Sequence, residues 1–401
     1  MSDLVAQIKS RAEAMASRLV KLRRDLHKHP ELRFAETRTA GLVAKRLRKL
    51  GLDVRTGVGK TGVVAVLKGG AKGKCVALRA DMDAINIQDE KSVEYKSTVP
   101  KVTHACGHDA HVAVGCGVAE VLAKRKKEIP GTVVFLFQPG EEIGLDGKSG
   151  AAAMIEDGAL KNPSPDAVFS LHCWPEYKAG TVGVAAGPAM AGADSITFHV
   201  YGEGAHAGTP QHGRDGVLVM AQCITALHHI IPRNMPPSEN CTLHFGIVRG
   251  GISRAILADH VRAVGTLRTL SEDTRKKMKR RIDETVSSIC NAYDAGSEIE
   301  WTLGIPPVIN DGALTDVVRS AAHEILGKKN TIEVEACPMT AEDFTLFIQD
   351  RPGFHLKLGV APPKRTRCFP LHHNCFDIDE AALPTGVKVL SLALLRYLGV
   401  E

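Results

Sequence analysis

Apolar residues alternate between helical and strand-like spacing over the first part of the chain. Helical spacing over residues 8–26 and 36–50 predicts two amphipathic helices. Short apolar runs at residues 63–67 and 75–80 predict strands, and the continuous run at 132–138 is typical of a strand buried on both faces. Strands that alternate with helices in this way indicate an α/β fold, with a mostly parallel sheet flanked by helices.

The spacing of apolar residues changes from about residue 187. Residues 187–302 follow the order strand, helix, strand, strand, helix, strand, which predicts a ferredoxin-like α+β domain. Patterns of the α/β type return over residues 303–401. We therefore expect one α/β domain built from residues 1–186 and 303–401, with a second domain inserted into it.

The size and charge of the chain agree with two domains and argue against several kinds of partner. At 401 residues and 44% hydrophobic content, the chain exceeds the length that one hydrophobic core usually serves. The formal charge is +6, but 51 basic and 45 acidic residues are mostly interleaved, which argues against a nucleic-acid surface. No apolar run approaches the ~18 residues that a membrane helix needs. We expect neither a nucleic-acid partner nor a membrane partner.

Cysteine usage predicts a cytoplasmic protein. The ten cysteines are scattered along the chain, and its start does not show the pattern of a secretory leader. This favours a reducing compartment over an oxidising one. In a reducing compartment, a cysteine can remain a thiolate and bind a metal ion.

The densest group of reactive side chains lies at residues 104–111, where the sequence reads HACGHDAH. Cys106 and His108 are separated by Gly107, so a turn there can aim both side chains at one point. Sulfur together with imidazole nitrogen is a donor set that suits zinc and similar transition ions. The alternative is a buried cysteine beside a polar helix cap, and further ligands are needed to decide between the two.

Residues of ligand type also follow three of the predicted strands. They are Asp81 and Asp83, Glu141 and Glu142, and His172. The carboxyl ends of parallel strands lie at one edge of a sheet, and ligands bind there in such folds. A single carboxylate at a strand end can be a simple helix cap, but three strand ends that carry such residues favour one shared site.

The adjacent glutamates indicate a hydrolytic reaction. Successive residues that leave a strand point in different directions, so one of Glu141 and Glu142 can bind metal while the other accepts a proton. With His372 or His373, the donors suffice for two metal ions that keep open positions. A water molecule activated by metal would attack, and the free glutamate would pass its proton to a leaving amine. Such a site hydrolyses an amide or peptide bond.

Ordered motifs run along almost the whole chain. They are HxHPE at 27–31, RADMDA at 79–84, HACGHDAH at 104–111, FQPGEE at 137–142, HCWP at 172–175, GEGAHAG at 202–208, AEDF at 341–344 and LHH at 371–373. With these motifs the chain resembles the metallopeptidase family M20. The resemblance is to its amidohydrolase branch of aminoacylases, hippurate hydrolases and indole-acetyl-amino-acid hydrolases.

The resemblance implies a domain organisation and a metal site. Residues 1–186 and 303–401 would form a zinc-peptidase-like catalytic domain, and residues 187–302 a lid and dimerisation domain. Two divalent transition metal ions would bind per subunit, and zinc, manganese, cobalt and nickel all suit such donors. The implied ligands are Cys106, His108, Glu142, His172 and His372, with Glu141 as the general base.

Two further residues receive roles from the resemblance. Asp83 falls where the family has an aspartate that orients the metal ligands. His206 falls where related enzymes have a lid histidine that reaches the active site of a partner subunit and polarises the scissile carbonyl. The resemblance therefore implies a homodimer or a homotetramer.

Two of the chain's departures from the branch concern the last metal ligand and substrate binding. At the last ligand it reads His-His-Asn instead of His-x-Pro, so His373 is an alternative to the better-aligned His372. The lid segment in which relatives carry an asparagine reads Ala-Ile-Leu-Ala at 255–258. If that asparagine helps to hold a substrate carboxylate, Arg268 or Arg254 is the candidate to replace it.

The expected reaction is hydrolysis of the amide bond of N-acyl amino acids or short peptides, with Glu141 as the base. A carboxypeptidase, or an aminohydrolase of aromatic amides, is the alternative with the same chemistry. A metal-dependent binding or regulatory protein is a third reading. The intact glutamate pair speaks against it, because a binding protein needs no uncoordinated base.

Overall fold

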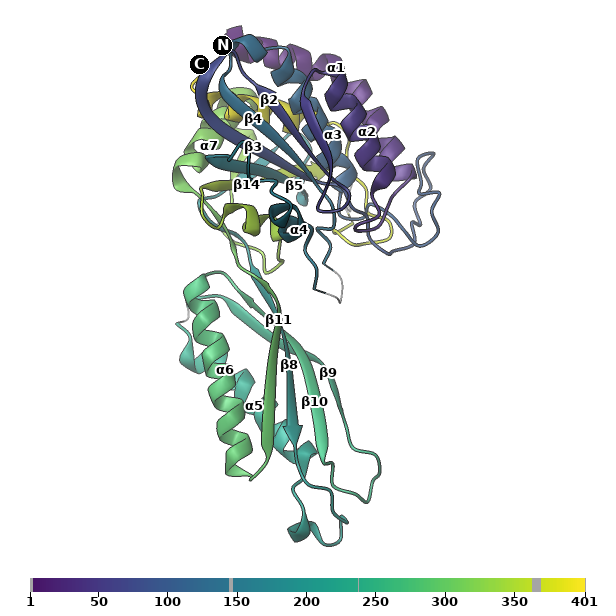
Figure 1. Cartoon of the computed structure of the whole chain (residues 1–401), viewed down its shortest axis with the longest axis vertical. Helices are drawn as coiled ribbons and strands as arrows, with labels where there is room; N and C mark the ends of the chain where they lie inside the picture. The colour runs from purple at the N-terminus through teal and green to yellow at the C-terminus, as the bar shows by residue number, and fades with distance from the viewer. Residues whose placement is uncertain (1–2, 144–146, 237, 363–368, 401) are drawn as a thin grey trace. The chain divides into compact units, whose positions relative to one another are not determined.

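The chain folds into two compact units, each described here by itself (Figure 1). The structure is a computed structural model, and it describes residues 3–143, 147–236, 238–362 and 369–400. The larger unit comprises Met1–Gly187, Ile309–Glu335 and Asp343–Glu401, and the smaller unit comprises Pro188–Val308 and Ala336–Glu342. Each unit has its own cluster of buried apolar side chains.

Among the described residues, a mixed sheet of eight strands forms the centre of the larger unit. In spatial order the strands are β1 (Asp53–Val58), β2 (Gly62–Lys68), β4 (Pro130–Gln138), β3 (Ala71–Asp81), β5 (Ala167–Lys178), β14 (Gly353–Ala361), β6 (Val182–Val184) and β13 (Thr331–Glu333). The four central strands β4, β3, β5 and β14 run parallel, whereas β1 and β2 are antiparallel to their neighbours. The predicted α/β fold with a mostly parallel sheet is confirmed.

Helices flank this sheet. They are α1 (Asp3–Lys28), α2 (Thr37–Lys49), α3 (His108–Ala123), α4 (Gly150–Glu156), α7 (Gly312–Leu326) and α8 (Ala382–Tyr397), with the short 3-10 helices η1 (Lys126–Glu128), η3 (Lys328–Asn330) and η4 (Asp343–Ile348). Helix α3 packs against α1, α8 and the sheet, so nearly all of its side chains are buried. Complete burial explains why its sequence is apolar on every side rather than on one stripe.

Two details of the sheet differ from the expectation. The apolar run at residues 167–171 predicts a strand that leads directly to His172, but β5 continues to Lys178. The reason is β14, which pairs with β5 as far as Lys178, whereas β3 pairs with it only as far as Ser170. His172 therefore lies just beyond the point where β5 loses one neighbour. Strand β1 was missed, because its mostly exposed residues show no apolar alternation.

The smaller unit contains a four-stranded antiparallel sheet with helices α5 and α6 packed on one face. Its elements are β8 (Gly192–Tyr201), α5 (Gly216–Asn234), β9 (Cys241–Gly250), β10 (His260–Thr269), α6 (Glu272–Ala292) and β11 (Gly296–Ile305), with the 3-10 helix η2 (Pro210–His212). The spatial order is β11-β8-β10-β9. This is the ferredoxin-like arrangement that the sequence predicts.

Local sequence explains where several of these elements begin. Asp215 caps α5 by accepting hydrogen bonds from the backbone N–H groups of Val217 and Leu218. Ser271 caps α6 through Thr274 in the same way. A separate two-stranded sheet pairs β7 (Gly187–Met190) with β12 (Val308–Asn310). Within the described ranges, no helix is long and apolar enough to cross a membrane, and no disulfide joins two of the described cysteines.

Candidate metal centre

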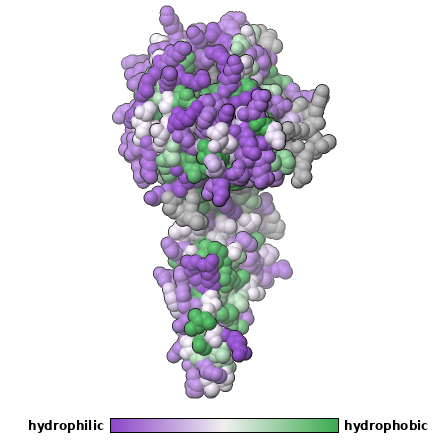
Figure 2. Space-filling view, turned by 90° about the vertical axis from the view of Figure 1, so that its right-hand side faces the viewer, coloured by the Kyte–Doolittle hydropathy of each residue, from purple (hydrophilic) through white to green (hydrophobic). Residues whose placement is uncertain are grey.

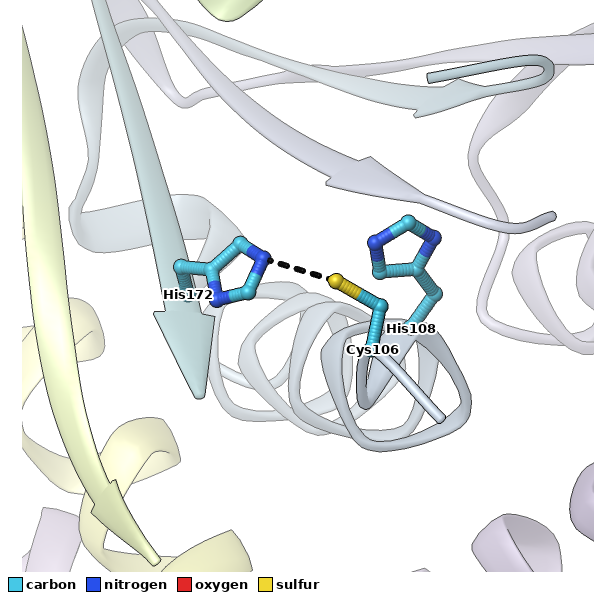
Figure 3. Close-up of side chains that lie close together, drawn as sticks. All are labelled: Cys106, His108 and His172. Atoms are coloured by element: carbon cyan, nitrogen blue, oxygen red, sulfur yellow. Dashed lines mark hydrogen bonds between the residues drawn. The ribbon is translucent and has the colours of Figure 1, made fainter. Parts of the chain in front are cut away.

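Cys106, His108 and His172 bring a sulfur and two imidazoles together at the edge of the central sheet (Figure 3). One ligand atom from each lies within 4.8 Å of the others, and Cys106 Sγ is 3.4 Å from His172 Nε2. Cys106 lies in the loop before α3, and His108 is the first residue of that helix. Between them Gly107 has a φ of +88°, a left-handed conformation that glycine adopts without strain.

Hydrogen bonds orient both imidazoles so that Nε2 faces the cluster. His108 Nδ1 lies 2.9 Å from the carbonyl oxygen of Asp83, and His172 Nδ1 lies 2.9 Å from that of Cys173. Carbonyl oxygens only accept, so each Nδ1 carries a proton and Nε2 is the nitrogen left to bind a metal ion. In the described part of the chain, His108 Nε2 is buried without a hydrogen-bond partner. Such orientation by outer partners is typical of metal-binding histidines.

Asp83 links the imidazole of His108 to the two glutamates. Its Oδ1 lies 3.2 Å from His108 Nδ1 and accepts a hydrogen bond from the backbone N–H of Glu141 at 3.1 Å. Its Oδ2 accepts from the backbone N–H of Glu142 at 2.9 Å. One buried carboxylate after β3 thus holds the turn that follows β4.

A second group of ligand atoms comprises Cys106, Glu142 and His372, again within 4.8 Å of one another. His372 Nε2 lies 3.0 Å from Glu142 Oε1, and the backbone N–H of His372 donates to the carbonyl of Ala105 at 2.8 Å. His373 faces elsewhere, since its ring stacks on Phe369 at 4.4 Å between ring centres. Of the two histidines left open by the sequence, His372 is the one beside the other candidate ligands.

The side chain of Glu141 lies beside two of these candidate ligands, His108 and Glu142. Its Oε2 is 3.9 Å from His108 Nε2, and its side chain is 11% exposed. With His108 and Glu142 it forms a third set of ligand atoms within 4.8 Å. A carboxylate at this place can accept a proton from a molecule bound at the cluster.

In the metal-free chain, two of the candidate ligands hold protons that a bound transition metal ion would displace, and the third holds no such proton. Burial raises the pKa of the Cys106 thiol well above its ordinary value, and Glu142 and Glu141 add to this. Burial lowers the pKa of His172, so its imidazole is neutral. Burial also acts to lower the pKa of His108, but Asp81 and Asp83 outweigh it and raise that pKa to about 10. The mixture of sulfur, nitrogen and carboxylate donors fits zinc, manganese, cobalt or nickel.

Asp81 and His111 belong to a buried ion network beside the cluster. The sequence indicated Asp81 as a candidate site residue, but not His111 or this network. Arg79 donates to Asp81 at 2.6 Å, and His111 Nδ1 lies 2.5 Å from the other oxygen of Asp81. His111 Nε2 accepts a hydrogen bond from the backbone N–H of Cys173 at 2.9 Å, so both of its nitrogens are in use. The RADMDA motif carried a signal, because Arg79 and Asp81 are two residues apart on one face of a strand.

In the smaller unit, His206 lies on an exposed loop whose backbone is held by residues 255–258. Ala207 donates to the carbonyl of Ala255, and Leu257 donates to that of Ala205. The segment that replaces the family's asparagine therefore anchors the loop. His206 Nδ1 accepts a hydrogen bond from the backbone N–H of Gly208 at 3.0 Å. The neutral ring must then carry its proton on Nε2, which can donate to a substrate.

Arg268 lies on β10 and is partly buried, whereas Arg254 lies on an exposed loop. Burial lowers the pKa of Arg268. No carboxylate of the described residues forms an ion pair with it. A guanidinium keeps its charge even when partly buried, so Arg268 is available to bind an anion.

Comparison with known proteins agrees with the resemblance in the motifs. Residues 77–396 match peptidase family M20/M25/M40. Thermostable carboxypeptidase 2 of Saccharolobus solfataricus is 36% identical over 397 residues, which cover 98% of this chain and 99% of that protein. An N-acetyl-L-cysteine deacetylase of Bacillus subtilis is 36% identical over 370 residues, which cover 92% of this chain and 85% of that protein.

A solved structure extends the comparison to the whole fold. The Bacillus subtilis YxeP protein, described as a dinuclear metal-binding peptidase of the M20 family, matches with a TM-score of 0.84 and 31% sequence identity. The match covers 97% of this chain and 100% of that chain. Family match, fold and clustered donor atoms agree: the chain belongs to peptidase family M20 and is a metal-dependent amidohydrolase of that family.

Proposed function

We propose that this enzyme hydrolyses the amide bond of N-acyl amino acids. The observation that carries the proposal is a second carboxylate beside the cluster. Glu142 is a candidate metal ligand, and Glu141 Oε2 also lies 3.9 Å from His108 Nε2. A site that only binds metal needs no such extra carboxylate. The name of the deacetylase relative gives an N-acetylated amino acid as its substrate, which supports this substrate class.

The chain's own residues divide the chemistry between them. The proposed metal ligands are Cys106, His108, Glu142, His172 and His372. When bound, a pair of divalent transition metal ions would activate a water molecule and polarise the substrate carbonyl. Glu141 accepts a proton from the attacking water and returns it to the nitrogen of the leaving amine. Asp83 positions this base and His108 together, since its carboxylate contacts both residues.

His206 is proposed to act in the active site of a second copy of the chain. Its Nε2–H donates to the carbonyl oxygen, where negative charge develops during attack. The bond from Gly208 to Nδ1 supports this role, because it sets the tautomer that donates from Nε2.

A homodimer, or a tetramer built from dimers, follows from that role. Hydrophobic side chains are visible on the surface of the smaller unit (Figure 2), and its exposed apolar residues include Val217, Leu218, Ile247, Val248, Ile252 and Ile256. Val217, Ile252 and Ile256 line one hollow of this surface, and contiguous exposed apolar side chains are typical of a surface that another chain covers.

Arg268 is proposed to bind the carboxylate of the amino-acid part of the substrate. A fork of N–H groups matches a carboxylate in geometry and charge. This assignment separates an N-acyl amino acid, which has a free carboxylate, from a simple aromatic amide. It leaves a carboxypeptidase as the second candidate, and the carboxypeptidase relative favours that candidate.

A substrate panel tests the proposal. The metal-loaded enzyme would be assayed on N-acetyl amino acids, N-benzoyl amino acids and dipeptides, with Glu141→Gln as the control for contaminating activity. We expect the highest kcat/KM on an acylated amino acid. The highest kcat/KM on a dipeptide would make the enzyme a carboxypeptidase, and no turnover of any compound in the panel would refute the proposed function.

A further inference from the structure

A guanidinium buried in the larger unit joins three carboxylates from distant parts of the chain. The side chain of Arg23, on α1, is 0% exposed. Its Nε donates to Asp109 at 2.9 Å, and its Nη2 donates to Asp377 at 2.8 Å. A third, longer contact of 3.5 Å reaches Glu380. No role in the proposed reaction requires this charge.

Two of these carboxylates lie on the segments that carry proposed metal ligands. Asp109 directly follows His108, and Asp377 lies on the same loop as His372. The backbone bond from His372 to Ala105 joins the same two segments on the side of the ligands. Arg23 therefore bridges the stretch that supplies Cys106 and His108 and the stretch that supplies His372.

Further polar residues hold Arg23 and its partners in one geometry. His27, one turn along α1, has Nδ1 2.6 Å from Asp109 and Nε2 3.3 Å from Asp89. The Tyr95 hydroxyl donates to the second oxygen of Asp377 at 2.7 Å. Its ring also lies 5.1 Å from the guanidinium carbon of Arg23. Few alternative positions remain for either carboxylate.

The ion pairs of Arg23 are shielded from solvent. The side chains of Arg23 and Asp109 are both 0% exposed, and that of Asp377 is 8% exposed. A buried ion network of this kind contributes little net stability compared with apolar packing, and its best-attested use is to specify one geometry. Arginine suits that use, because its rigid fork holds two carboxylates at set angles and a lysine ammonium cannot.

We propose that Arg23 is a positioning residue that sets the spacing between the Cys106–His108 segment and the His372 segment, and thereby the affinity of the metal group that contains His372. The inference rests on the proposed metal-dependent function. It goes beyond that function because Arg23 lies on the first helix and belongs to none of the ligand groups. We assign to it control over the affinity of the ion bound by Cys106, Glu142 and His372.

Zinc titration of the metal-stripped protein tests the proposal without relying on activity. Competition with a chromophoric chelator reports how many Zn²⁺ ions bind and how tightly each is held. Arg23→Lys keeps the charge but loses the fork, so we expect one of the two zinc equivalents to lose about 10- to 100-fold in affinity, while the other changes by less than about threefold. Arg18→Lys is the matched control, since Arg18 lies on the same helix, pairs with Glu120 at 2.8 Å and is 60% exposed.

Asp377→Asn provides a second variant with the same expected result, should Arg23→Lys fail to fold. The double variant should lose little more affinity than either single one, because both changes cut the same link. Unchanged affinity for both zinc ions in these variants, with only a lower thermal midpoint, would make the network purely structural and overturn the inference. Such a result would leave the proposed function intact. A wild-type chain that binds none of Zn²⁺, Mn²⁺, Co²⁺ and Ni²⁺ would overturn both.

Discussion

The protonation of the proposed ligands predicts that metal binding depends steeply on pH. Burial, with Glu142 and Glu141, raises the pKa of Cys106 well above its ordinary value of 9 in the metal-free chain. The pKa of His108 is about 10, because Asp81 and Asp83 outweigh the effect of burial. Near neutral pH both groups therefore hold a proton that an incoming ion must displace.

The magnitude follows from the number of protons released. His172 releases none, since burial lowers its pKa and keeps it neutral. The ion that binds Cys106, His108 and His172 thus displaces two protons, and its affinity should rise about a hundredfold per pH unit near neutrality. For His108 alone, a pKa of about 10 lies three units above pH 7, which corresponds to about 4 kcal/mol.

Calorimetry in two buffers of different ionisation enthalpy measures the protons released per ion. We expect about two at pH 7 for the ion bound by Cys106, His108 and His172, and about one in Asp81→Asn, which removes the carboxylate that raises the pKa of His108 the most. Asp25→Asn is a suitable control, because Asp25 is 41% exposed and pairs with Arg38. Metal affinity that stays flat with pH, with no protons released, would refute this reasoning.

Three further predictions concern turnover and stability. Glu141→Gln should keep its metal but lose about 10²- to 10⁴-fold in kcat because it removes the proton acceptor, and near-normal turnover with full metal content would rule out that role. His206→Ala should lose about 10²- to 10³-fold at unchanged metal content, and mixing it with Glu141→Gln should restore activity if subunits share sites. Burial raises the pKa of Glu36 from 4.5 to about 7. The folded chain therefore holds that proton more tightly than the unfolded chain. As the pH rises from 4.5 to about 7, the free energy of unfolding of the metal-free wild type should fall by about 3 kcal/mol relative to that of Glu36→Gln, which urea unfolding measures.

Much of the fold was predictable, because apolar spacing reflects which face of an element is buried. The continuous apolar run of β4 and the alternation of Ile196, Phe198 and Val200 in β8 both match their burial. The polar edge strand β1 gave no such signal. The far end of β5 was also unpredictable, since it depends on pairing with β14, which lies far away in sequence.

The candidate site was predictable where motifs carried it and not where distant residues decide it. Cys106, His108 and Glu142 follow from short motifs. Alignment of the motif favours His372 over His373, but the contacts that place His372 are with Glu142 and Ala105, which lie far away in the sequence. The contact of Arg23 with Asp377 joins residues 354 positions apart, so periodicity along the chain could not reveal it.

The most direct test of the central claim is a titration of metal-stripped enzyme with Zn²⁺ while turnover of an N-acyl amino acid is recorded. The account predicts no turnover without metal and maximal turnover when two ions are bound per chain. A stripped enzyme that remains fully active would contradict it.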